Sequence, residues 1–345
     1  MHATLKTAVL GATGYSGFEL TQLLLRHPQL ATPLLMRREG DAGPSTLAEA
    51  FPALAGNGQY ALHPFSWGKL HDHGVDLLFL ATPHEVSRML VPEAISRGMR
   101  VIDLSGAWRL KTPAHSAVYG FHGTPETAAL LDQAVYGLPE LASEKIRHAS
   151  LVANPGCYAT SVILALAPLV CAGVIDRQKG IIADSKSGVS GAGKEPTAKT
   201  HFVSVADNLS AYSVFGHRHT GEILEQLDLR SQELIFTPHL LPIPRGILST
   251  IYVHLAKPMS TAEVDSCFRE FFKNARWIRI FPSPQLPQIQ FSLRTNYCDI
   301  GFSLADDQQR LVLVSCVDNL LKGAAGQAVQ NMNLMNGWNE AEGLA

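Results

Sequence analysis

A chain of 345 residues with 46% hydrophobic content is long enough to form two domains with separate cores. Its 28 basic and 30 acidic residues nearly balance, and no basic run exceeds Arg37-Arg38, which argues against a nucleic-acid-binding or anionic-membrane-binding surface. The longest apolar stretch, Val162 to Ile175, is interrupted by Pro168 and is shorter than the roughly 20 residues of a membrane span. The composition therefore favours a soluble protein with small-molecule partners.

The N-terminus and the cysteines predict a reducing compartment. Met1 leads into the apolar run Thr7 to Leu10 without a signal-peptide pattern. The five cysteines are odd in number and widely spaced, which is not the pattern of a disulfide framework. We therefore expect the protein in the cytoplasm.

The first predicted elements are a strand at Thr7 to Leu10, a glycine turn at 11–17 and a helix that includes Phe18 to Leu25. Glycines let the backbone approach a pyrophosphate closely, and the following helix N-terminus supplies N–H donors. The spacing is GxxGxxG rather than GxGxxG, so a simple tight turn is the alternative. The predicted dinucleotide-binding residues here are Gly11, Thr13, Gly14, Tyr15, Ser16 and Gly17.

Further strands are predicted at Pro33 to Met36, Val75 to Leu80 and Arg100 to Leu104, and they alternate with helical segments. This alternation predicts an α/β fold with a Rossmann-type, doubly wound parallel sheet. Arg37 and Arg38 follow the second strand, where an NAD-binding protein usually has an acidic residue for the ribose hydroxyls. Two arginines suit a 2′-phosphate and predict NADP, although solvated surface arginines are the alternative.

Cys157 follows the predicted strand end Leu151-Val152 and the turn Asn154-Pro155-Gly156, and it precedes an apolar helix. At a helix N-terminus, unpaired N–H groups and the helix dipole favour a thiolate and can stabilise an oxyanion. A buried structural cysteine is the alternative. The turn-then-helix setting favours a reactive thiol.

The segment Gly188 to Lys194 matches the first seven positions of a P-loop, GxxxxGK. The eighth position is Glu195, where a hydroxyl side chain must hold magnesium, and Pro196 follows. We therefore reject a nucleoside triphosphatase and expect a loop beside the thiol.

His217 and His219 precede a predicted helix that includes Ile223 to Leu227. A histidine at a helix start has a lowered pKa and can act as a neutral base or as a hydrogen-bonded partner at pH 7. A zinc site is not predicted, because the pair lacks further ligands at a convincing spacing.

Together these motifs resemble the N-acetyl-gamma-glutamyl-phosphate reductase family, relatives of aspartate-semialdehyde dehydrogenase in the arginine pathway. The resemblance covers nearly the whole chain, in order. It rests on the segments Gly11 to Gly17, Ala81 to His84, Asp103 to Ser105 with Arg109, Tyr136 to Glu140, Val152 to Thr160, Lys186 to Gly188, His217 to His219, Pro244 to Gly246 and Asp318 to Gln327.

The resemblance implies that NADPH reduces N-acetyl-gamma-glutamyl phosphate to N-acetylglutamate semialdehyde and phosphate. The Cys157 thiolate would form a thioester, and one histidine would return a proton, with His219 favoured and His217 close behind. Arg109 and Arg245 are candidates for binding the phosphate and the carboxylate, with the assignment open, because a guanidinium pairs bidentately with either anion. The resemblance adds Lys186 to the substrate site, and Pro83, His84, Ser187, Gly188 and Asn319 to the cofactor site.

The predicted domains are residues 1–155 plus 315–345 for NADP binding, and an inserted α+β domain of residues 156–314 for catalysis and subunit association. The run Val312 to Val317 and the Gly/Ala-rich helix after it are expected to pack on the first domain. Strands are expected at Gly180 to Asp184, Leu234 to Thr237, Thr250 to Ala256 and Ile289 to Phe291, in a mostly antiparallel sheet, with a helix at Thr261 to Asn274. The resemblance implies a homotetramer, and a dimer is the alternative.

Two other functions remain open at this point. One is reduction of a related acyl phosphate, such as aspartyl phosphate or aminoadipyl phosphate. The other is a non-catalytic NADP-binding protein on the same fold.

Overall fold

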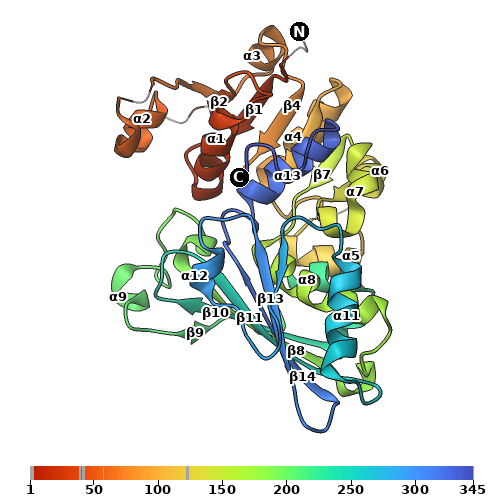
Figure 1. The fold of residues 1–345 in the computed structure, drawn as a ribbon. Coiled ribbons are helices and arrows are strands. Elements are labelled where there is room, and N and C mark those ends of the chain that lie inside the picture. The colour runs from red at the N-terminus through yellow and green to blue at the C-terminus, as the bar shows by residue number, and fades with distance from the viewer. Residues whose placement is uncertain (1–3, 39, 41–42, 57, 122–123, 345) are drawn as a thin grey trace. The chain divides into compact units, whose positions relative to one another are not determined.

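The computed structural model describes residues 4–38, 40, 43–56, 58–121 and 124–344. The chain divides into two compact units (Figure 1). The first contains residues 1–111, 122–155 and 324–345, and the second contains residues 112–121 and 156–323. Each unit has its own sheet, and each is described by itself.

The first unit contains a parallel sheet with the strand order β3-β2-β1-β4-β5-β7-β6. All four residues of the central strands β1 and β4 are buried, as expected for strands covered on both faces. The strands are β1 (Thr7–Leu10), β2 (Leu34–Arg37), β3 (Leu62–Pro64), β4 (Leu77–Leu80), β5 (Arg100–Asp103), β6 (Val135–Tyr136) and β7 (Leu151–Ala153). The predicted Rossmann-type doubly wound sheet is confirmed.

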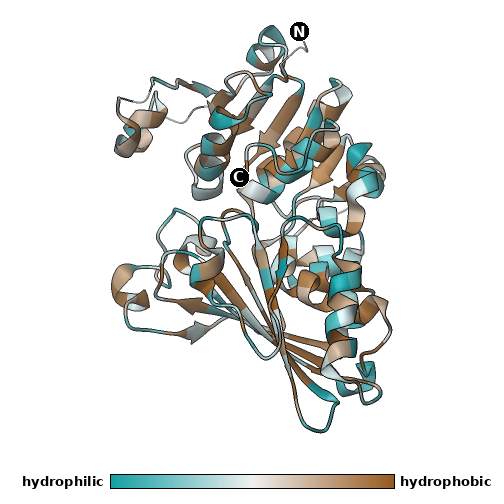
Figure 2. Cartoon of the chain, in the orientation of Figure 1, coloured by the Kyte–Doolittle hydropathy of each residue, from teal (hydrophilic) through white to brown (hydrophobic). Residues whose placement is uncertain are grey.

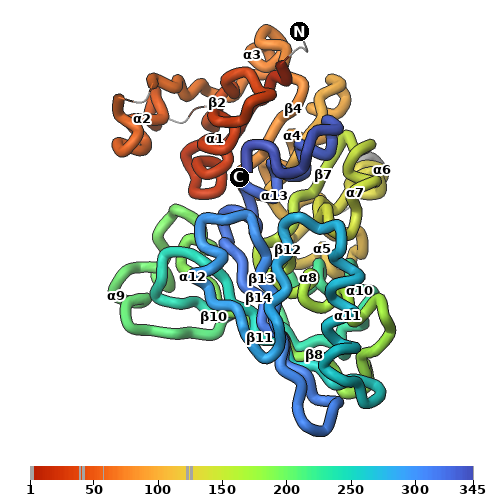
Figure 3. Tube along the Cα trace, viewed as in Figure 1, coloured from red at the N-terminus to blue at the C-terminus, as the bar shows by residue number. Residues whose placement is uncertain are grey.

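Except for the last one, the helices of this unit lie between successive strands along the chain. They are α1 (Tyr15–Arg26), α2 (Leu47–Ala50), η1 (Pro52–Leu54), α3 (Trp67–Asp72), α4 (His84–Ser96), α6 (Pro125–Gln133), α7 (Pro139–Arg147) and α13 (Ala325–Met335). The last helix, α13, contacts both α1 and α7 (Figure 3). Gln327 and Asn331 on α13 donate hydrogen bonds to Gly137 O, which joins the chain's last helix to this unit.

The second unit contains a mixed sheet with the order β12-β13-β14-β11-β8-β10-β9. Its strands are β8 (Ile181–Gly188), β9 (Ser210–Ala211), β10 (Leu234–Leu241), β11 (Ile247–His254), β12 (Ile278–Ile280), β13 (Cys298–Leu304) and β14 (Arg310–Val317). The β8–β10 and β12–β13 pairs are parallel and the other four pairs are antiparallel, so the sheet is mostly antiparallel as expected. Figure 2 shows the apolar colouring of its strands.

Helix α8 packs against β11, β13 and β14, and it also contacts α10 and α11 (Figure 1). The helices of the second unit are α5 (Pro113–Ser116), η2 (Ala117–Tyr119), α8 (Cys157–Cys171), η3 (Arg177–Lys179), η4 (Val189–Ala192), α9 (Phe202–Val205), α10 (Thr220–Leu227), η5 (Ser231–Glu233), α11 (Thr261–Phe271) and α12 (Ile289–Ser292). Within the described residues, no helix is long and apolar enough to cross a membrane.

Two expectations differ from the structure. Ile289 to Phe291 forms the short helix α12 rather than a strand, because a three-residue apolar run does not distinguish the two. Strand β14 pairs with β11 and β13 along its whole length, so residues 315–323 belong to the second unit and the chain returns to the first unit at Ala324. Residues 112–121 also join the second unit, where Glu225 accepts a hydrogen bond from the Thr112 N–H and pairs with His115.

Candidate active site

Cys157 is the first residue of α8, and Gly156 is the N-cap without a side-chain capping bond. The predicted order of strand, Asn-Pro-Gly turn and helix is therefore present, with β7 ending at Ala153. The thiol residue is partly exposed. A Cβ added to Gly323 would lie 2.7 Å from the Cys157 Cβ, so only glycine leaves room for the thiol residue there. The helix N-terminus offers the N–H groups that an oxyanion requires.

Four buried serines attach α8 to the sheet below it. Ser161 Oγ on α8 lies 2.9 Å from Ser249 Oγ on β11 and 3.0 Å from Ser315 Oγ on β14. Ser249 Oγ in turn accepts a hydrogen bond from Ser185 Oγ on β8. Because buried polar groups hold their partners in fixed geometry, this network fixes the position of the helix that begins with Cys157.

His219 lies against the turn that precedes the thiol. A Cβ added to Gly156 would lie 2.5 Å from His219 Nε2, so the imidazole occupies the space that a side chain would need. His219 is the N-cap of α10 and is only 6% exposed. The structure thus brings one of the two predicted histidines to the backbone beside Cys157.

Glu222 on α10 joins the same cluster, although no sequence motif points to it. Its Oε2 accepts a hydrogen bond from the Gly156 N–H at 2.9 Å, and its Oε1 lies 3.9 Å from His219 Nε2. The side chain is fully buried. In the sequence, only the spacing of three residues between His219 and Glu222 on one predicted helix could have indicated this role. The hydrogen-bond partner, Gly156, lies 66 residues before Glu222.

His217 is neutral at physiological pH. Burial, with a smaller effect from the Arg218 charge, lowers the pKa of His217 to about 4. Its Nδ1 accepts a hydrogen bond from the His219 N–H at 3.2 Å, which places the ring proton on Nε2. The two imidazole centroids are 4.7 Å apart. The lowered pKa was predicted, but burial rather than the helix start is its main cause.

Tyr158 and Tyr212 form a second layer around the histidines. The Tyr158 hydroxyl donates to His239 O at 2.8 Å, and the Tyr212 hydroxyl donates to the Tyr158 hydroxyl at 3.3 Å. The Tyr158 ring packs edge-on against His217. Burial raises the pKa of both phenols, so both stay protonated near neutral pH. They position the imidazole rings and do not supply a base.

Arg245 and Lys186 have different surroundings in the second unit. Arg245 Nε donates to both oxygens of Asp318, at 2.7 and 2.9 Å, and Asp318 is fully buried. Lys186 forms an ion pair with Asp184 at 3.0 Å. Because Ser185 faces the α8 side and side chains alternate along a strand, Lys186 lies on the opposite face of the sheet from α8. The structure therefore does not bring Lys186 to Cys157.

Ser187, Gly188 and Asn319 lie where β8 and β14 end. Asn319 Oδ1 accepts a hydrogen bond from the Gly246 N–H at 2.7 Å, and its Nδ2 donates to Ser190 Oγ. A Cβ added to Gly188 would lie 2.5 Å from Arg245 N. The GxxxxGK segment thus packs against residues 244–246. It contains the short helix η4, and the long helix that follows a P-loop does not come after it.

Arg109 belongs to the first unit. Its Nε donates to Asn154 O and its Nη2 to Leu104 O, each at 2.7 Å. Its guanidinium therefore joins the segments that follow β5 and β7, and the residue is only 7% exposed. The relation of Arg109 to Cys157 stays a prediction.

The predicted dinucleotide loop lies at the carboxyl edge of the first sheet. Gly11 has a φ of +93°, and a Cβ there would lie 2.3 Å from Ala81 O. A Cβ on Gly17 would lie 2.0 Å from Gly11 O. Helix α1 begins at Tyr15 with Gly14 as its N-cap, so N–H groups are available for a pyrophosphate beside Thr13 and Ser16. These residues fit a dinucleotide.

Two further groups adjoin this edge of the sheet. Arg37 is the last residue of β2, and its Nε and Nη1 are buried without a hydrogen-bond partner among the described residues. Such buried donors suit an anionic ligand. Arg38 is exposed. Pro83 is the N-cap of α4 and His84 is its first residue, close to the Ala81 carbonyl that lies against Gly11.

Across the part of the chain that is described, no group of three or more His, Cys, Asp or Glu residues could hold a metal ion.

Known protein families match both units. The family described as "Semialdehyde dehydrogenase, NAD binding domain" matches residues 6–149, and "Semialdehyde dehydrogenase, dimerisation domain" matches residues 157–319. The first unit is therefore a nicotinamide dinucleotide-binding domain, and the chain is an oxidoreductase.

Solved structures share the fold. Aspartate semialdehyde dehydrogenase II of Vibrio cholerae, complexed with ASA, has a TM-score of 0.70 and 18% identity, covering 97% of this chain and 98% of that chain. Aspartate semialdehyde dehydrogenase of Candida albicans, solved with NADP, has a TM-score of 0.68 and 17% identity, covering 97% of this chain and 99% of that chain.

Several relatives of higher identity are named N-acetyl-gamma-glutamyl-phosphate reductase. The protein of Desulfotalea psychrophila is 44% identical over 345 residues, covering 99% of this chain and 98% of the relative. The Bacillus subtilis protein is 40% identical with the same coverage, and the Methanocaldococcus jannaschii protein is 43% identical, covering 98% of this chain and 97% of the relative. The resemblance in the sequence motifs is confirmed, and the chain belongs to the N-acetyl-gamma-glutamyl-phosphate reductase family.

Proposed function

We propose that the chain reduces N-acetyl-gamma-glutamyl phosphate with NADPH, giving N-acetylglutamate semialdehyde and phosphate, through a thioester on Cys157. The observation that carries this proposal is the thiol at the first residue of α8, with His219 against the preceding Gly156. An acyl phosphate is an activated carboxyl group that a thiolate can attack. The substrate of this proposal is taken from the relatives' names, N-acetyl-gamma-glutamyl-phosphate reductase.

In the first half of the reaction the Cys157 sulfur attacks the carbonyl carbon of the acyl phosphate. The N–H groups at the start of α8 stabilise the tetrahedral oxyanion, and phosphate leaves as the carbonyl reforms. The enzyme then carries the acyl group as a thioester. His219 takes up the thiol proton before attack, because its ring lies beside the Cys157 backbone.

In the second half the thioester is reduced and released. When bound, NADPH supplies the hydride to the thioester carbon, which forms a thiohemiacetal on Cys157. His219 returns its proton to the sulfur as the carbon–sulfur bond breaks, and the aldehyde leaves. Glu222 is a positioning residue in this scheme, because it binds the Gly156 N–H and lies 3.9 Å from His219.

We assign the binding of the substrate anions to Arg245 and Arg109, with the division between phosphate and carboxylate left open. Asp318 holds the Arg245 guanidinium in one orientation, which favours recognition of a planar or tetrahedral anion. Lys186 has no role in this scheme, since it lies on the sheet face opposite α8.

We assign NADP rather than NAD to the first unit. The buried Nε and Nη1 of Arg37, which lack partners among the described residues, support a 2′-phosphate at the end of β2. We also propose the reducing cytoplasm as the site of action, since none of the five cysteines, all of them in the described part of the chain, forms a disulfide.

We further propose that the second unit forms a homo-oligomer through the face of its sheet opposite α8. Ile182, Ile235 and Tyr252 are 44%, 40% and 44% exposed. They are direct cross-strand neighbours on β8, β10 and β11, so they form one apolar patch. The family description of residues 157–319 as a dimerisation domain supports this interface.

The function is tested in the reverse direction. The purified protein should oxidise N-acetylglutamate semialdehyde with NADP only when phosphate is present, and it should act on aspartate semialdehyde far more slowly. Preference for aspartate semialdehyde would indicate a related acyl-phosphate reductase. NADP binding without turnover of either aldehyde would indicate the non-catalytic alternative.

A further inference from the structure

Helix α13 is buried along its whole length, although several of its side chains are amides. Burying an amide costs free energy unless its polar atoms find partners, so an apolar side chain would pack there at a lower cost. The buried amides, each at most 1% exposed, are Gln327, Gln330, Asn331 and Asn333. The hydrogen bonds of these side chains therefore show which parts of the first unit the helix holds in place.

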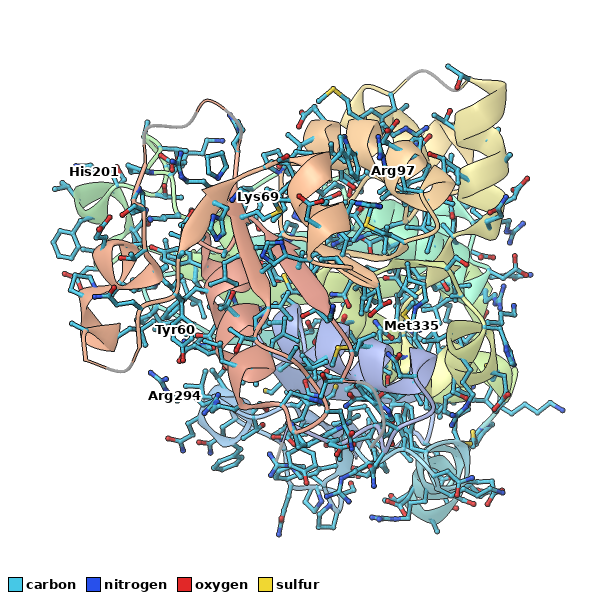
Figure 4. The ribbon with its side chains drawn as sticks, turned by 90° about the horizontal axis from the view of Figure 1, so that it is seen from above. Tyr60, Lys69, Arg97, His201, Arg294 and Met335 are labelled. Atoms are coloured by element: carbon cyan, nitrogen blue, oxygen red, sulfur yellow. The ribbon has the colours of Figure 1, made fainter. Side chains whose placement is uncertain are left out.

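The C-terminal end of α13 is fixed to the parallel sheet. Figure 4 labels Met335, the last residue of this helix. Arg100, the first residue of β5, donates from Nη1 to Met335 O at 3.0 Å and from Nη2 to Asn336 Oδ1 at 2.8 Å. A guanidinium that binds two acceptors at once restricts their orientation. Asn331, about one turn before Met335, therefore has a defined position above the sheet.

Asn331 begins a chain of hydrogen bonds that leads to the end of β7. Its Nδ2 donates to Gly137 O at 2.8 Å and to Asn154 Oδ1 at 3.0 Å. Asn154 Nδ2 in turn donates to Ala324 O at 3.0 Å. A backbone carbonyl can only accept, so Gly137 O and Ala324 O determine which way both amides point. Neither amide can rotate by 180° without placing two acceptors against each other.

The backbone of Asn154 holds Arg109. Asn154 O accepts the Arg109 Nε–H at 2.7 Å, and the Asn154 N–H donates to Asp103 O at 2.8 Å. All four polar atoms of Asn154 thus have partners, and the residue is only 1% exposed. A buried network that is fully satisfied in this way is rigid. Asn331 and Arg109 are bonded to the same residue, and all of these groups belong to the first unit.

We propose that Asn331 is a positioning residue for Arg109, an inference that rests on the substrate-binding role proposed for that arginine. Asn331 fixes the Asn154 side chain, and Asn154 fixes the guanidinium from which a substrate anion accepts hydrogen bonds. Without the Asn331 amide, Asn154 Oδ1 is buried without its donor and the Asn154 amide is free to rotate. The Arg109 guanidinium then loses its fixed orientation, so the anion binds more weakly.

Binding is measured by calorimetry on the NADPH-saturated protein, with inorganic phosphate and N-acetylglutamate semialdehyde titrated separately. NADPH cannot accept a hydride, so the aldehyde is not oxidised and the measurement needs no turnover. Asn331→Ala should weaken the binding of one of these two anions by about tenfold. Arg109→Lys should weaken the binding of the same anion. That anion is then the one that Arg109 binds.

The matched control is Asn333→Ala. Asn333 is a fully buried asparagine on the same helix, but its partners are His27 and the carbonyls of Glu340 and Glu342. It should leave the binding of both anions unchanged. Asn331→Asp, which keeps the shape of the side chain and removes the donor, is the second variant and should give the same loss as Asn331→Ala. An unchanged affinity for NADPH shows that the first unit is folded in each variant.

Steady-state kinetics in the direction of aldehyde oxidation separates positioning from a general loss of structure. Asn331→Ala should raise KM for the affected anion by about tenfold and change kcat by less than about twofold. In the Arg109→Lys background, which lacks the Nε–H that Asn154 O accepts, adding Asn331→Ala should have no further effect.

Three results would overturn the proposal. They are unchanged binding of both anions in Asn331→Ala and Asn331→Asp, an equal loss in Asn333→Ala, and a full additional loss in the Arg109→Lys background. A parent protein that binds the anions without turnover would contradict the proposed function, while the calorimetric comparison of the variants would still decide the role of Asn331. A parent that binds neither anion would contradict both.

Discussion

His217 and His219 are two residues apart, yet their imidazoles have different surroundings. His219 contacts the backbone beside the thiol, whereas His217 accepts a hydrogen bond from His219 and packs against Tyr158. The first arrangement suits proton transfer to sulfur. The second suits support of the neighbouring ring.

We therefore expect His219→Ala to lower kcat by about 10² to 10⁴, the usual range for loss of an acid–base group. His217→Ala should cost much less or should act mainly on KM. Steady-state kinetics of both variants would measure the difference. Equal and small losses would mean that a water molecule or another group moves the proton.

Protonation of His217 should make the free energy of unfolding depend on pH. Its folded-state pKa is about 4, while an unfolded chain has a histidine pKa near 6.5. As pH falls through this window the unfolded state binds the proton first, so the free energy of unfolding decreases by on the order of 3 kcal/mol. Above pH 6.5 the group has no effect.

Urea unfolding between pH 7 and 4.5 should therefore show a shallower loss of stability in His217→Gln than in the parent. His148→Gln, at an exposed position, is the control and should follow the parent. An unchanged slope in His217→Gln would show that the residue is not buried in its neutral form.

At the scale of elements, the sequence predicted the parts that local pattern determines. The run Thr7 to Leu10 and the glycine turn predicted β1 and the start of α1, because buried parallel strands are continuously apolar. The turn before Cys157 predicted the helix that begins there. The strand predicted at Ile289 to Phe291 was wrong because short apolar runs are ambiguous.

The remaining features depend on partners far away in the sequence. Glu222 owes its role to the Gly156 N–H, and the membership of β14 in the second sheet depends on pairing with β11 and β13. Side chains alternate along β8, and α8 packs on one face of the sheet, so Lys186 lies on the opposite face. No local pattern contains this information.

The end of β2 carries the prediction on cofactor choice. Charge-assisted contacts to a phosphate contribute roughly 1.5 to 3 kcal/mol each, or about tenfold or more in affinity. The double change Arg37→Ala, Arg38→Ala should raise KM for NADPH and leave NADH largely unaffected. Arg147→Ala on α7 serves as the control. If the double variant prefers NADPH over NADH as strongly as the parent does, Thr13 or Ser16 binds the 2′-phosphate instead.

At the scale of the whole molecule, the apolar patch of the second sheet should determine the assembly. The change Ile235→Lys places a charge beside Ile182 and against the same patch of the partner subunit. We therefore expect the oligomer to dissociate to smaller species in sedimentation velocity. Leu286→Lys, with a similar exposed fraction of 39%, should leave the assembly unchanged. The same oligomer in both variants would place the interface elsewhere.

The central claim is that one thiol carries the acyl group, and turnover of Cys157→Ala tests it most directly. Cys298 and Cys316 are buried, burial raises the pKa of Cys267, and Cys171 follows no turn although it is exposed. The account predicts that Cys157→Ala binds NADP and folds as the parent does but has no measurable reductase activity, while Cys171→Ala is fully active. Near-parental turnover by Cys157→Ala would contradict the covalent mechanism.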